Sequence, residues 1–346
     1  MSHAFAAPAA VPADPTLLEV LRAITIHSPS SFQIGDETIA LPAQQGVFEA
    51  QAGYGGATGL VGLLQQQLYQ RAFCSRFGKP APTGAQPDDP HFVQRLSAAN
   101  TGRDRWEGGW TVRRNEPSGQ LLVEKGGRLR LLWPGEFLAR EVATAAPRPG
   151  TVVTIFAPRE SLTFQPGFYF AFGETLPDQI EEQRVLRFYW NVDAEQVPEL
   201  IHRLTRTLNR FQVPFRLKCL TNPAAFARID AAVLYVGRRY YAITRRLLEA
   251  EYEAIAQALQ PETPLFTKEL APGLGFAEDP ADGQSFGMSR CRIVAEGIWS
   301  AFCQGSQAPE IRLRETAAQF ARYGLSFERP YLNPGGVDRY AFTRGS

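Results

Sequence analysis

Two short β-strands that flank an amphipathic helix constrain the fold of this chain more than any other feature. The first strand reads VLRFYWNV from Val185, and the second reads FRLKCL from Phe215. Between them, apolar residues recur at the spacing of a helix that buries one face: Val197, Leu200, Ile201, Leu204, Leu208 and Phe211. The segment from Arg228 to Asp230 then leads into a third strand. We therefore predict an α+β protein.

Both strands carry polar side chains where apolar ones are expected. Because strand side chains alternate between faces, Arg187, Tyr189 and Asn191 share one face of the first strand. In the same way, Arg216 and Lys218 share one face of the second strand. A buried charge is unfavourable unless it is paired, so a purely structural strand has little use for these residues. If the two faces coincide, the cations and the phenol converge and predict an anion site.

The composition excludes several classes of function. The chain has 346 residues, 44% hydrophobic and 21% charged, which is typical of a globular protein that folds alone. Its 36 basic and 35 acidic residues give a net charge of +1, so no global field attracts nucleic acid or an anionic membrane. The cysteines are widely spaced without a zinc-ligand pattern, which favours reduced thiols in a cytoplasm: Cys74, Cys219, Cys291 and Cys303.

Composition along the chain predicts three parts. Residues 1–15, rich in Ala and Pro, are predicted to be a disordered lead without a signal sequence. Residues 16–148 are predicted to form a helical region with a β-hairpin, and residues 149–346 an α+β domain. The run AAPRPG at 145–150 marks the boundary between them. We expect the helix-rich N-terminal part to pack on a twisted, mainly antiparallel sheet in the C-terminal part.

Hydrophobic periodicity predicts the individual elements. Helices are expected at Leu17–Ile26, Gly59–Phe77, His91–Asn100 and Ile243–Leu259, and strands at 120–124, 129–133, 151–156 and 168–172. The C-terminal third is expected to be rich in loops, and the acidic pair Glu278-Asp279 before Pro280 is placed in one of them.

Familiar catalytic motifs are missing from the sequence. None of the four histidines has an evident nucleophile to serve in a triad: His3, His27, His91 and His202. The glycine-rich run at 53–59 lacks the Lys-Ser/Thr ending of a phosphate-binding loop. The carboxylates Glu181-Glu182 sit in a polar run, which favours a solvated loop over a hydrolytic dyad. The cationic strands remain the best functional candidate.

Six further motifs carry a family resemblance. They read GFYFAFGETL at 167–176, RFYWN at 187–191, FRLK at 215–218, RIDAAVLY at 228–235, PLFTK at 264–268 and QSFGMSRC at 284–291. These runs resemble the HopA-type effector family, over roughly residues 48 to 300. That family includes the HopA-like lyase components of class V lanthipeptide and thioamitide biosynthesis. It is distantly similar to bacterial phosphothreonine lyases.

The resemblance implies roles for individual residues. In the phosphothreonine lyases, a Phe-His-Ile-Ser strand precedes a helix, and the next strand carries the base lysine. Here FYWN at 188–191 precedes the helix, so the resemblance implies that Lys218 is the base and that Tyr189 replaces the acid histidine. It also implies phosphate binding by Arg187, Arg228 and Arg290. Further substrate-binding candidates in the matching motifs are Asn191, Asp230, Lys268, Ser285 and Ser289.

The implied activity is a phosphoserine/phosphothreonine lyase that makes dehydroalanine or dehydrobutyrine in a lanthipeptide-type precursor. β-Elimination needs a base at the α carbon, stabilisation of the enolate-like carbonyl and cations around the departing phosphate. Forked arginine donors suit the phosphate oxygens, and no cofactor or metal is implied. The expected partners are the phosphorylated precursor peptide, a separate Ser/Thr peptide kinase and a cyclase, with no nucleic acid or membrane.

Structural explanations stand beside these roles. Lys218 could protect a sheet edge from aggregation, and Tyr189 could simply favour a strand. Arg187 and Arg228 could form structural ion pairs with Asp230 or Glu174. Ser285 and Ser289 could be turn residues of a glycine-rich loop. On these readings, the chain is a non-catalytic peptide-binding scaffold or a translocated effector.

Overall fold

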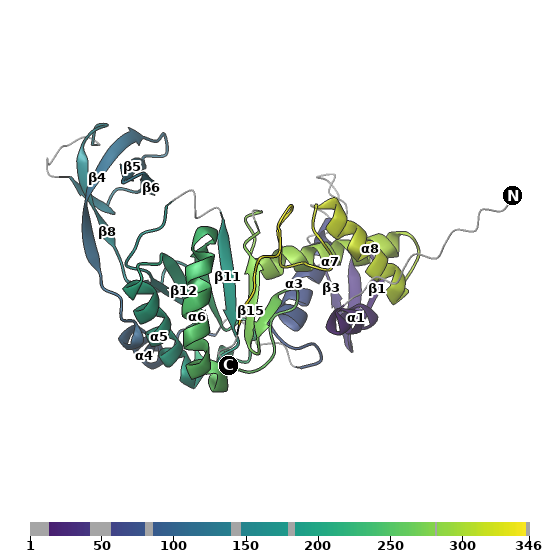
Figure 1. The fold of residues 1–346 in the computed structure, drawn as a ribbon. Helices are drawn as coiled ribbons and strands as arrows, with labels where there is room; N and C mark the ends of the chain where they lie inside the picture. Colours follow the sequence, from purple (N-terminus) through teal and green to yellow (C-terminus); the bar gives the residue numbers. More distant parts are fainter. Residues whose placement is uncertain are drawn as a thin grey trace. The chain divides into compact units, whose positions relative to one another are not determined.

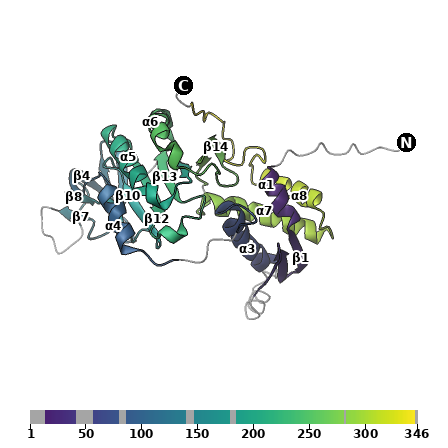
Figure 2. The same ribbon diagram turned by 90° about the horizontal axis from the view of Figure 1, so that it is seen from below.

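The computed structural model describes residues 14–41, 57–79, 86–139, 147–178, 184–280 and 282–343 (Figures 1 and 2). Contacts divide the chain into two compact units that are both discontinuous in sequence. The first unit comprises Met1–Pro82, Pro264–Lys268 and Asp282–Arg339, and the second comprises Thr83–Thr263, Glu269–Ala281 and Tyr340–Ser346. The predicted division at 148–149 stays a prediction, and the predicted lead lies outside the described residues up to residue 13.

The first unit combines helices with a small antiparallel sheet. The sheet has the order β1 (Ile24–Ser28), β2 (Ser31–Ile34) and β3 (Glu37–Ala40). The helices are α1 (Pro15–Arg22), α3 (Ala57–Leu68) with its π-helical extension η1 (Tyr69–Phe73), α7 (Phe286–Cys303) and α8 (Pro309–Arg322). Helix α7 packs against both α3 and α8. It is buried on almost every side, which makes it the core helix of this unit.

A seven-stranded sheet forms the centre of the second unit. Its order is β14 (Lys268–Ala271), β15 (Leu274–Glu278), β11 (Val185–Trp190), β13 (Ala232–Gly237), β12 (Phe215–Leu220), β10 (Phe168–Phe172) and β9 (Glu160–Ser161). Strands β11, β13 and β12 are therefore interior strands with a neighbour on each side. Their central place explains why Arg187 is buried, whereas Arg216 and Lys218 of β12 are half-buried.

Helices cover one face of this sheet (Figure 1). They are α4 (Pro90–Ala99), α5 (Val197–Arg210) and α6 (Tyr241–Ile255). Helix α5 packs on β10 and β12, and α6 packs on β13. Phe188 of β11 points to this side, because its ring stacks on that of Tyr241 in α6 at 6.5 Å between centroids. Arg187 and Tyr189, with the opposite strand parity, therefore point to the other face.

A five-stranded antiparallel sheet completes the second unit. Its order is β6 (Arg128–Leu132), β5 (Leu121–Lys125), β4 (Arg105–Asn115), β8 (Val152–Ala157) and β7 (Phe137–Ala139). One face carries a buried cluster of Trp110, Val112, Leu121, Val123, Leu132, Val153 and Ile155. Strand β8 pairs with β4 across the predicted boundary at 145–150, part of which lies outside the described residues.

The α+β class is confirmed, but helices and strands are interleaved along the chain. The N-terminal part holds strands β1 to β7 as well as helices, so the predicted separation into a helical part and a sheet part is wrong. The loop-rich C-terminal third is also wrong, since it contains β14, β15, α7 and α8. Among single elements, the strand at 168–172 is confirmed residue for residue. The first helix ends at Arg22, and Ile24 to Ile26 belong to a strand instead.

Two further properties bear on function. Of the cysteines Cys74, Cys219, Cys291 and Cys303, only Cys303 is exposed. No helix in the described part of the chain has both the length and the apolarity needed to cross a membrane.

Candidate functional site

The strand register puts the polar faces of β11 and β12 on the same side of the sheet. Arg187 of β11 and Arg216 of β12 both pair with Tyr235 of β13. One row further along, Tyr189 and Lys218 both pair with Val233. Residues directly opposite one another in paired strands point to the same side. We call this set of residues, on the face opposite the helices, the cationic face.

The dimensions of a sheet place these side chains within reach of one small anion. Neighbouring strands lie about 4.8 Å apart, so Tyr189 and Lys218 are separated by about 10 Å across Val233. Two rows of same-side residues lie about 7 Å apart along a strand. Long side chains from both rows can therefore meet above the small side chain of Val233.

Arg187 forms an ion pair that the sequence did not predict. Its guanidinium binds the carboxylate of Asp279, which follows the last residue of β15. Placing Glu278-Asp279 in a loop was therefore wrong in part, because Glu278 ends a buried strand and only Asp279 lies beyond it. The Cζ atoms of Arg187 and Arg216 each lie 5.2 Å from the ring centroid of Tyr235. The tyrosine ring therefore lies between two cations, and both are attracted to its electron-rich π face.

Tyr189 is a protonated phenol in the interior of this face. Its side chain is buried, and burial raises its pKa, while the neighbouring Arg187 charge opposes this effect only in part. A phenol with a raised pKa keeps its proton at neutral pH. Tyr189 can therefore donate a hydrogen bond or a proton, and cannot act there as a base.

Arg228 and Asp230 form a bidentate ion pair in the turn before β13. Nε and Nη2 of Arg228 each donate to one carboxylate oxygen of Asp230 at 2.8 Å. Burial raises the pKa of Asp230, but the charge and hydrogen bonds of Arg228 and the charge of Lys218 outweigh it, so the pKa is lower than usual. The charge of the same carboxylate also raises the pKa of Tyr189. The alternative of an Arg228–Asp230 ion pair is thus present in the structure.

Lys218 and Arg216 differ from the other cations of this face. Within the described residues, neither forms an ion pair with a carboxylate. Nζ of Lys218 donates to Oε1 of Gln165 over 3.5 Å and lies 4.2 Å from the ring centroid of Phe168. Arg216 has a second aromatic neighbour, Phe164, at 5.7 Å. The alternative that Lys218 protects a sheet edge is wrong, because β12 lies between β13 and β10.

The other predicted site residues have local structural contacts. Asn191 donates to the carbonyl of Glu262 over 3.0 Å, next to the strand end of β11. Lys268 binds Asp338 at 2.7 Å, and Ser285 caps helix α7 by accepting from the amide of Met288. Ser289 donates to Asp282 over 2.8 Å. The glycine-rich loop predicted for both serines is wrong, because Ser289 lies inside α7.

Arg290 also lies inside α7, in the first unit, whereas the cationic face lies in the second. Its side chain is 1% exposed, and it donates to the carbonyls of Pro330 and Leu332 over 2.7 Å and 3.2 Å. These contacts hold the segment that follows α8. Its role in phosphate binding stays a prediction.

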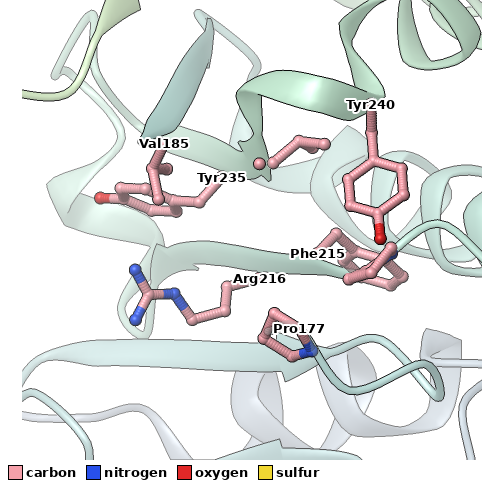
Figure 3. A pocket seen from close by; sticks show the side chains of 9 residues that line it. Pro177, Val185, Phe215, Arg216, Tyr235 and Tyr240 are labelled. Atoms are coloured by element: carbon pink, nitrogen blue, oxygen red, sulfur yellow. The ribbon is translucent and has the colours of Figure 1, made fainter. Parts of the chain in front are cut away.

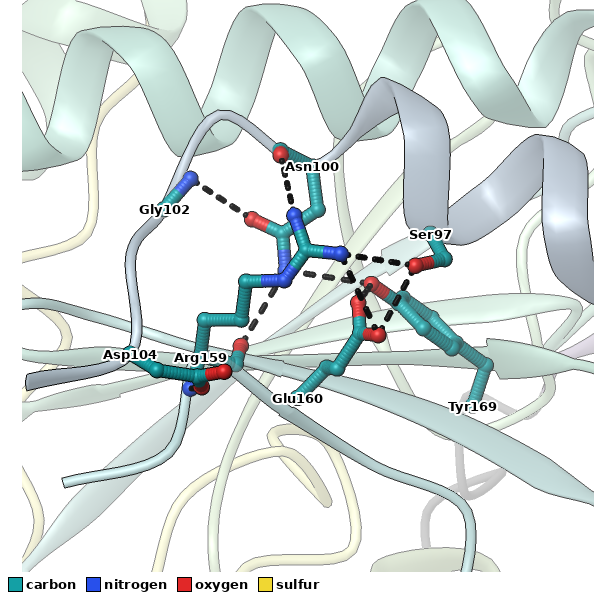
Figure 4. Close-up of polar contacts among 7 residues, drawn as sticks. All are labelled: Ser97, Asn100, Gly102, Asp104, Arg159, Glu160 and Tyr169. Carbon is teal, nitrogen blue, oxygen red and sulfur yellow. Dashed lines mark hydrogen bonds and ion pairs between the residues drawn. The ribbon is translucent and has the colours of Figure 1, made fainter. Parts of the chain in front are cut away.

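A second polar cluster lies on the helix-covered side of the sheet (Figure 4). The hydroxyl of buried Tyr169 donates to Glu160 over 2.7 Å and accepts from Asn100 over 3.0 Å. Arg159 donates to Ser97 over 2.8 Å and to the carbonyl of Asn100 over 3.3 Å. Tyr169 pairs with Cys219, so its parity is opposite to that of Lys218. The cluster therefore joins α4 to β9 and β10 and does not belong to the cationic face.

The sequence analysis missed most of this cluster. Asn100 was only the end of a predicted helix and Tyr169 only part of the motif at 167–176, whereas Arg159 and Glu160 gave no signal on their own. Burial raises the pKa of Tyr169, and its hydrogen bond to Glu160 acts in the same direction. The phenol is thus fixed as a donor to Glu160.

A comparison with known protein families matches the part of the chain that forms the cationic face. Residues 159–332 match the HopA1 effector protein family, which is half of the chain and contains the whole cationic face. The chain belongs to the HopA1 effector protein family.

Solved structures with a similar fold include two effector proteins from Pseudomonas syringae. The effector of pathovar tomato strain DC3000 is 15% identical, with a TM-score of 0.45, and the match covers 78% of this chain and 90% of the effector. The effector of pathovar syringae strain 61 is also 15% identical with a TM-score of 0.45, over 84% of this chain and 95% of the effector. No curated protein matches the sequence.

Proposed function

We propose that this chain is a phosphoserine/phosphothreonine lyase that acts on a phosphorylated precursor peptide. The observation that supports this proposal best is the register of the sheet. It puts Lys218 and Tyr189 in one row of a single face and the two arginines Arg187 and Arg216 in the next. A base, an acid and cations are the three groups that elimination of phosphate requires. The proposal also uses the family resemblance described for the sequence.

In the proposed reaction, the lone pair of Nζ of Lys218 takes the α proton of the phosphorylated residue. The electron pair of the C–H bond becomes the Cα–Cβ double bond, and the Cβ–O bond to phosphate breaks with its electrons on oxygen. The protonated hydroxyl of Tyr189 donates a hydrogen bond or its proton to that leaving oxygen. The products are dehydroalanine or dehydrobutyrine, inorganic phosphate and a protonated lysine; where Tyr189 transfers its proton, a tyrosinate also forms and later regains a proton, so atoms and charges balance.

Arg216 is the arginine that we propose as the main phosphate ligand. Arg187 and Arg228 already bind Asp279 and Asp230, so carboxylates neutralise much of their charge. Arg216 contacts aromatic rings instead, and no ion pair holds it within the described residues. A guanidinium without a carboxylate offers its forked donors to phosphate without first losing a partner. Arg187 and Arg228 would contribute positive charge around it.

A second candidate function is binding of a phosphopeptide without elimination. The pairing of Arg187 and Arg228 with carboxylates favours it, because it leaves only two cations of this face for the reaction. On this view, the chain is a scaffold subunit or an effector that holds its target. The two functions differ in whether phosphate leaves the peptide.

Single-turnover elimination on a saturating phosphothreonine peptide, followed by mass spectrometry, tests the proposal. Lys218→Ala should abolish loss of phosphoric acid while leaving phosphopeptide affinity within a few-fold of wild type, because a base acts only in the transition state. Tyr189→Phe should slow elimination by about 10²-fold or more, the usual contribution of a general acid. Arg216→Ala should weaken binding of the phosphopeptide but not of its unphosphorylated form.

Lys125→Ala is the matched control, since this lysine binds Glu107 on the five-stranded sheet. It should eliminate at the wild-type rate. Retention of the wild-type rate by Lys218→Ala would refute the mechanism. A wild-type protein that binds the phosphopeptide and leaves it intact would instead support the binding function.

A further inference from the structure

A small apolar hollow opens beside Arg216 in the second unit (Figure 3). It lies where β11 and β12 begin and β13 ends. Its walls are Pro177, Val185, Pro214, Phe215, Arg216, Tyr235, Val236, Gly237 and Tyr240. Among the described residues of its wall there is no carboxylate, and the guanidinium of Arg216 is the one charged group.

The hollow is continuous with the cationic face, because the two share Arg216 and Tyr235. These two residues form one row of that face, and the row of Tyr189 and Lys218 lies next to it. In the opposite direction, the strands end at Val185 and Gly237, which pair with each other in the wall of the hollow. A ligand that occupies the cationic face and extends along the strands therefore meets the hollow.

The size of the hollow suits one side chain. Its volume is about 40 Å³. A water molecule needs about 10–15 Å³ of such a volume, so the hollow has room for about three heavy atoms. This is about the size of the valine or leucine side chain. Sites for nucleotides or other large cofactors span about 300–1,000 Å³. Prolines, a valine and aromatic rings in the wall favour an aliphatic occupant over a polar one.

We propose that this hollow is a specificity subsite for an aliphatic residue two positions from the phosphorylated residue of the peptide. The inference rests on the proposed function for the placement of the phosphorylated residue over Lys218. In an extended peptide, side chains two positions apart point the same way and lie about 7 Å apart. The row of Lys218 and the row of Arg216 are separated by the same spacing. The residue two positions away therefore lies over the row of Arg216 and Tyr235, and both of these residues line the hollow.

Binding of synthetic phosphothreonine peptides to the Lys218→Ala variant tests this subsite without turnover. Each peptide carries alanines around the phosphothreonine, and one position at a time receives leucine or its polar isostere asparagine. Leucine two positions away, on one side, should tighten binding about 10-fold over alanine, the smallest effect typical of methylenes in an apolar pocket. Asparagine there should give no gain. Leucine at the adjacent positions should give none either, because those side chains point away.

Filling the hollow should remove the preference. Val185→Phe puts a ring into the wall, and it should bind the leucine and alanine peptides equally. Val152→Phe is the matched control, because Val152 is 54% exposed on the five-stranded sheet, and it should keep the 10-fold preference. If Val185→Phe does not fold, Tyr240→Ala replaces it, and this wider hollow should shift the preference from leucine to phenylalanine.

The outcomes separate this inference from the proposed function. Equal affinity for leucine, alanine and asparagine peptides, or equal gains at adjacent and alternate positions, would overturn the subsite even if wild type eliminates phosphate. A leucine preference with no elimination by wild type would overturn the lyase and retain the subsite. A preference that survives in a folded Val185→Phe variant would place the aliphatic site elsewhere and refute this assignment.

Discussion

Asp230 is a buried carboxylate in the turn before β13, and its charge makes the stability of the second unit depend on pH. Its pKa is lowered in the folded protein, chiefly by Arg228 against the opposing effect of burial. A lowered folded pKa means that the carboxylate stabilises the fold fully above its unfolded pKa of about 3.9. That contribution is lost as the pH falls from there towards the folded pKa.

We therefore expect Asp230→Asn to lower stability at neutral pH by about 3 kcal/mol, because the variant leaves the largely buried Arg228 without its carboxylate. The difference between wild type and variant should shrink below about pH 4, where the wild-type carboxylate begins to accept a proton. Thermal denaturation of both proteins between pH 3 and 7 measures this. A difference that stays constant over the whole range would show that Asp230 has no coupled titration.

Single residues also show how far the sequence could predict the site. Strand parity alone predicted that Arg187 and Tyr189 share one face of their strand and that Arg216 and Lys218 share one face of theirs, since that pattern is local. Only the register with β13 shows that the two faces coincide. The partner of Arg187 could not be predicted, because Asp279 lies 92 residues away and only the sheet register brings it there. Such distant pairings decide which cations already bind a carboxylate of the protein and which can bind a ligand instead.

Among the secondary-structure elements, α7 shows why the C-terminal third was misread. Its buried residues lie on nearly every side, so the helix lacks the apolar stripe by which a surface helix is found. Its N-cap and first turn together hold two serines and a glycine, which is the composition of a loop. The amphipathic α5 was predicted correctly because it buries only one face.

The packing of α7 against α8 gives a prediction at the scale of these elements. A Cβ atom on Gly297 would lie 2.5 Å from Cα and 2.6 Å from the amide nitrogen of Thr316. These are backbone atoms, so the helices would have to separate. Gly297→Ala should therefore destabilise the protein by about 1–3 kcal/mol, the usual effect of overpacking a core.

Gly62→Ala is the control for helix propensity. Gly62 lies inside α3, and nothing stands within 4 Å of an added Cβ. This variant should be unchanged or more stable by up to about 1 kcal/mol, because alanine favours a helix over glycine. Chemical denaturation of both variants makes the comparison. Equal effects of the two substitutions would contradict the close helix contact.

On the scale of the whole molecule, neither unit is a continuous piece of sequence. The first unit combines Met1–Pro82 with Asp282–Arg339, and the last residues from Tyr340 belong to the second unit. The tail residue Tyr340 is buried, and its hydroxyl donates to Glu278 over 2.5 Å within the second unit. Such long-range closure leaves no local composition signal, so the sequence could suggest a boundary only from a Pro-rich run.

This organisation predicts the behaviour of a fragment cut at the sequence-based boundary. Residues 149–346 keep the seven-stranded sheet and the cationic face but lose β4, which pairs with β8. Val153 and Ile155 of β8, which are buried in the full chain, would then be exposed to solvent. The same cut removes α3, which packs on α7, and Asn100, which holds Tyr169. Both units would expose apolar surface that the full chain buries.

We expect the fragment 149–346 to lack a cooperative thermal transition and to bind a hydrophobic dye, whereas the full chain should melt in a cooperative transition and bind little dye. The physical reason is that each unit loses strands or helices from its core, and a domain's net stability of about 5–15 kcal/mol does not survive the loss of several buried side chains. Circular dichroism and dye fluorescence on both proteins make the test. A sharp transition of the fragment with little dye binding would show that residues 149–346 form an independent domain, and that this domain does not need the N-terminal elements for its stability.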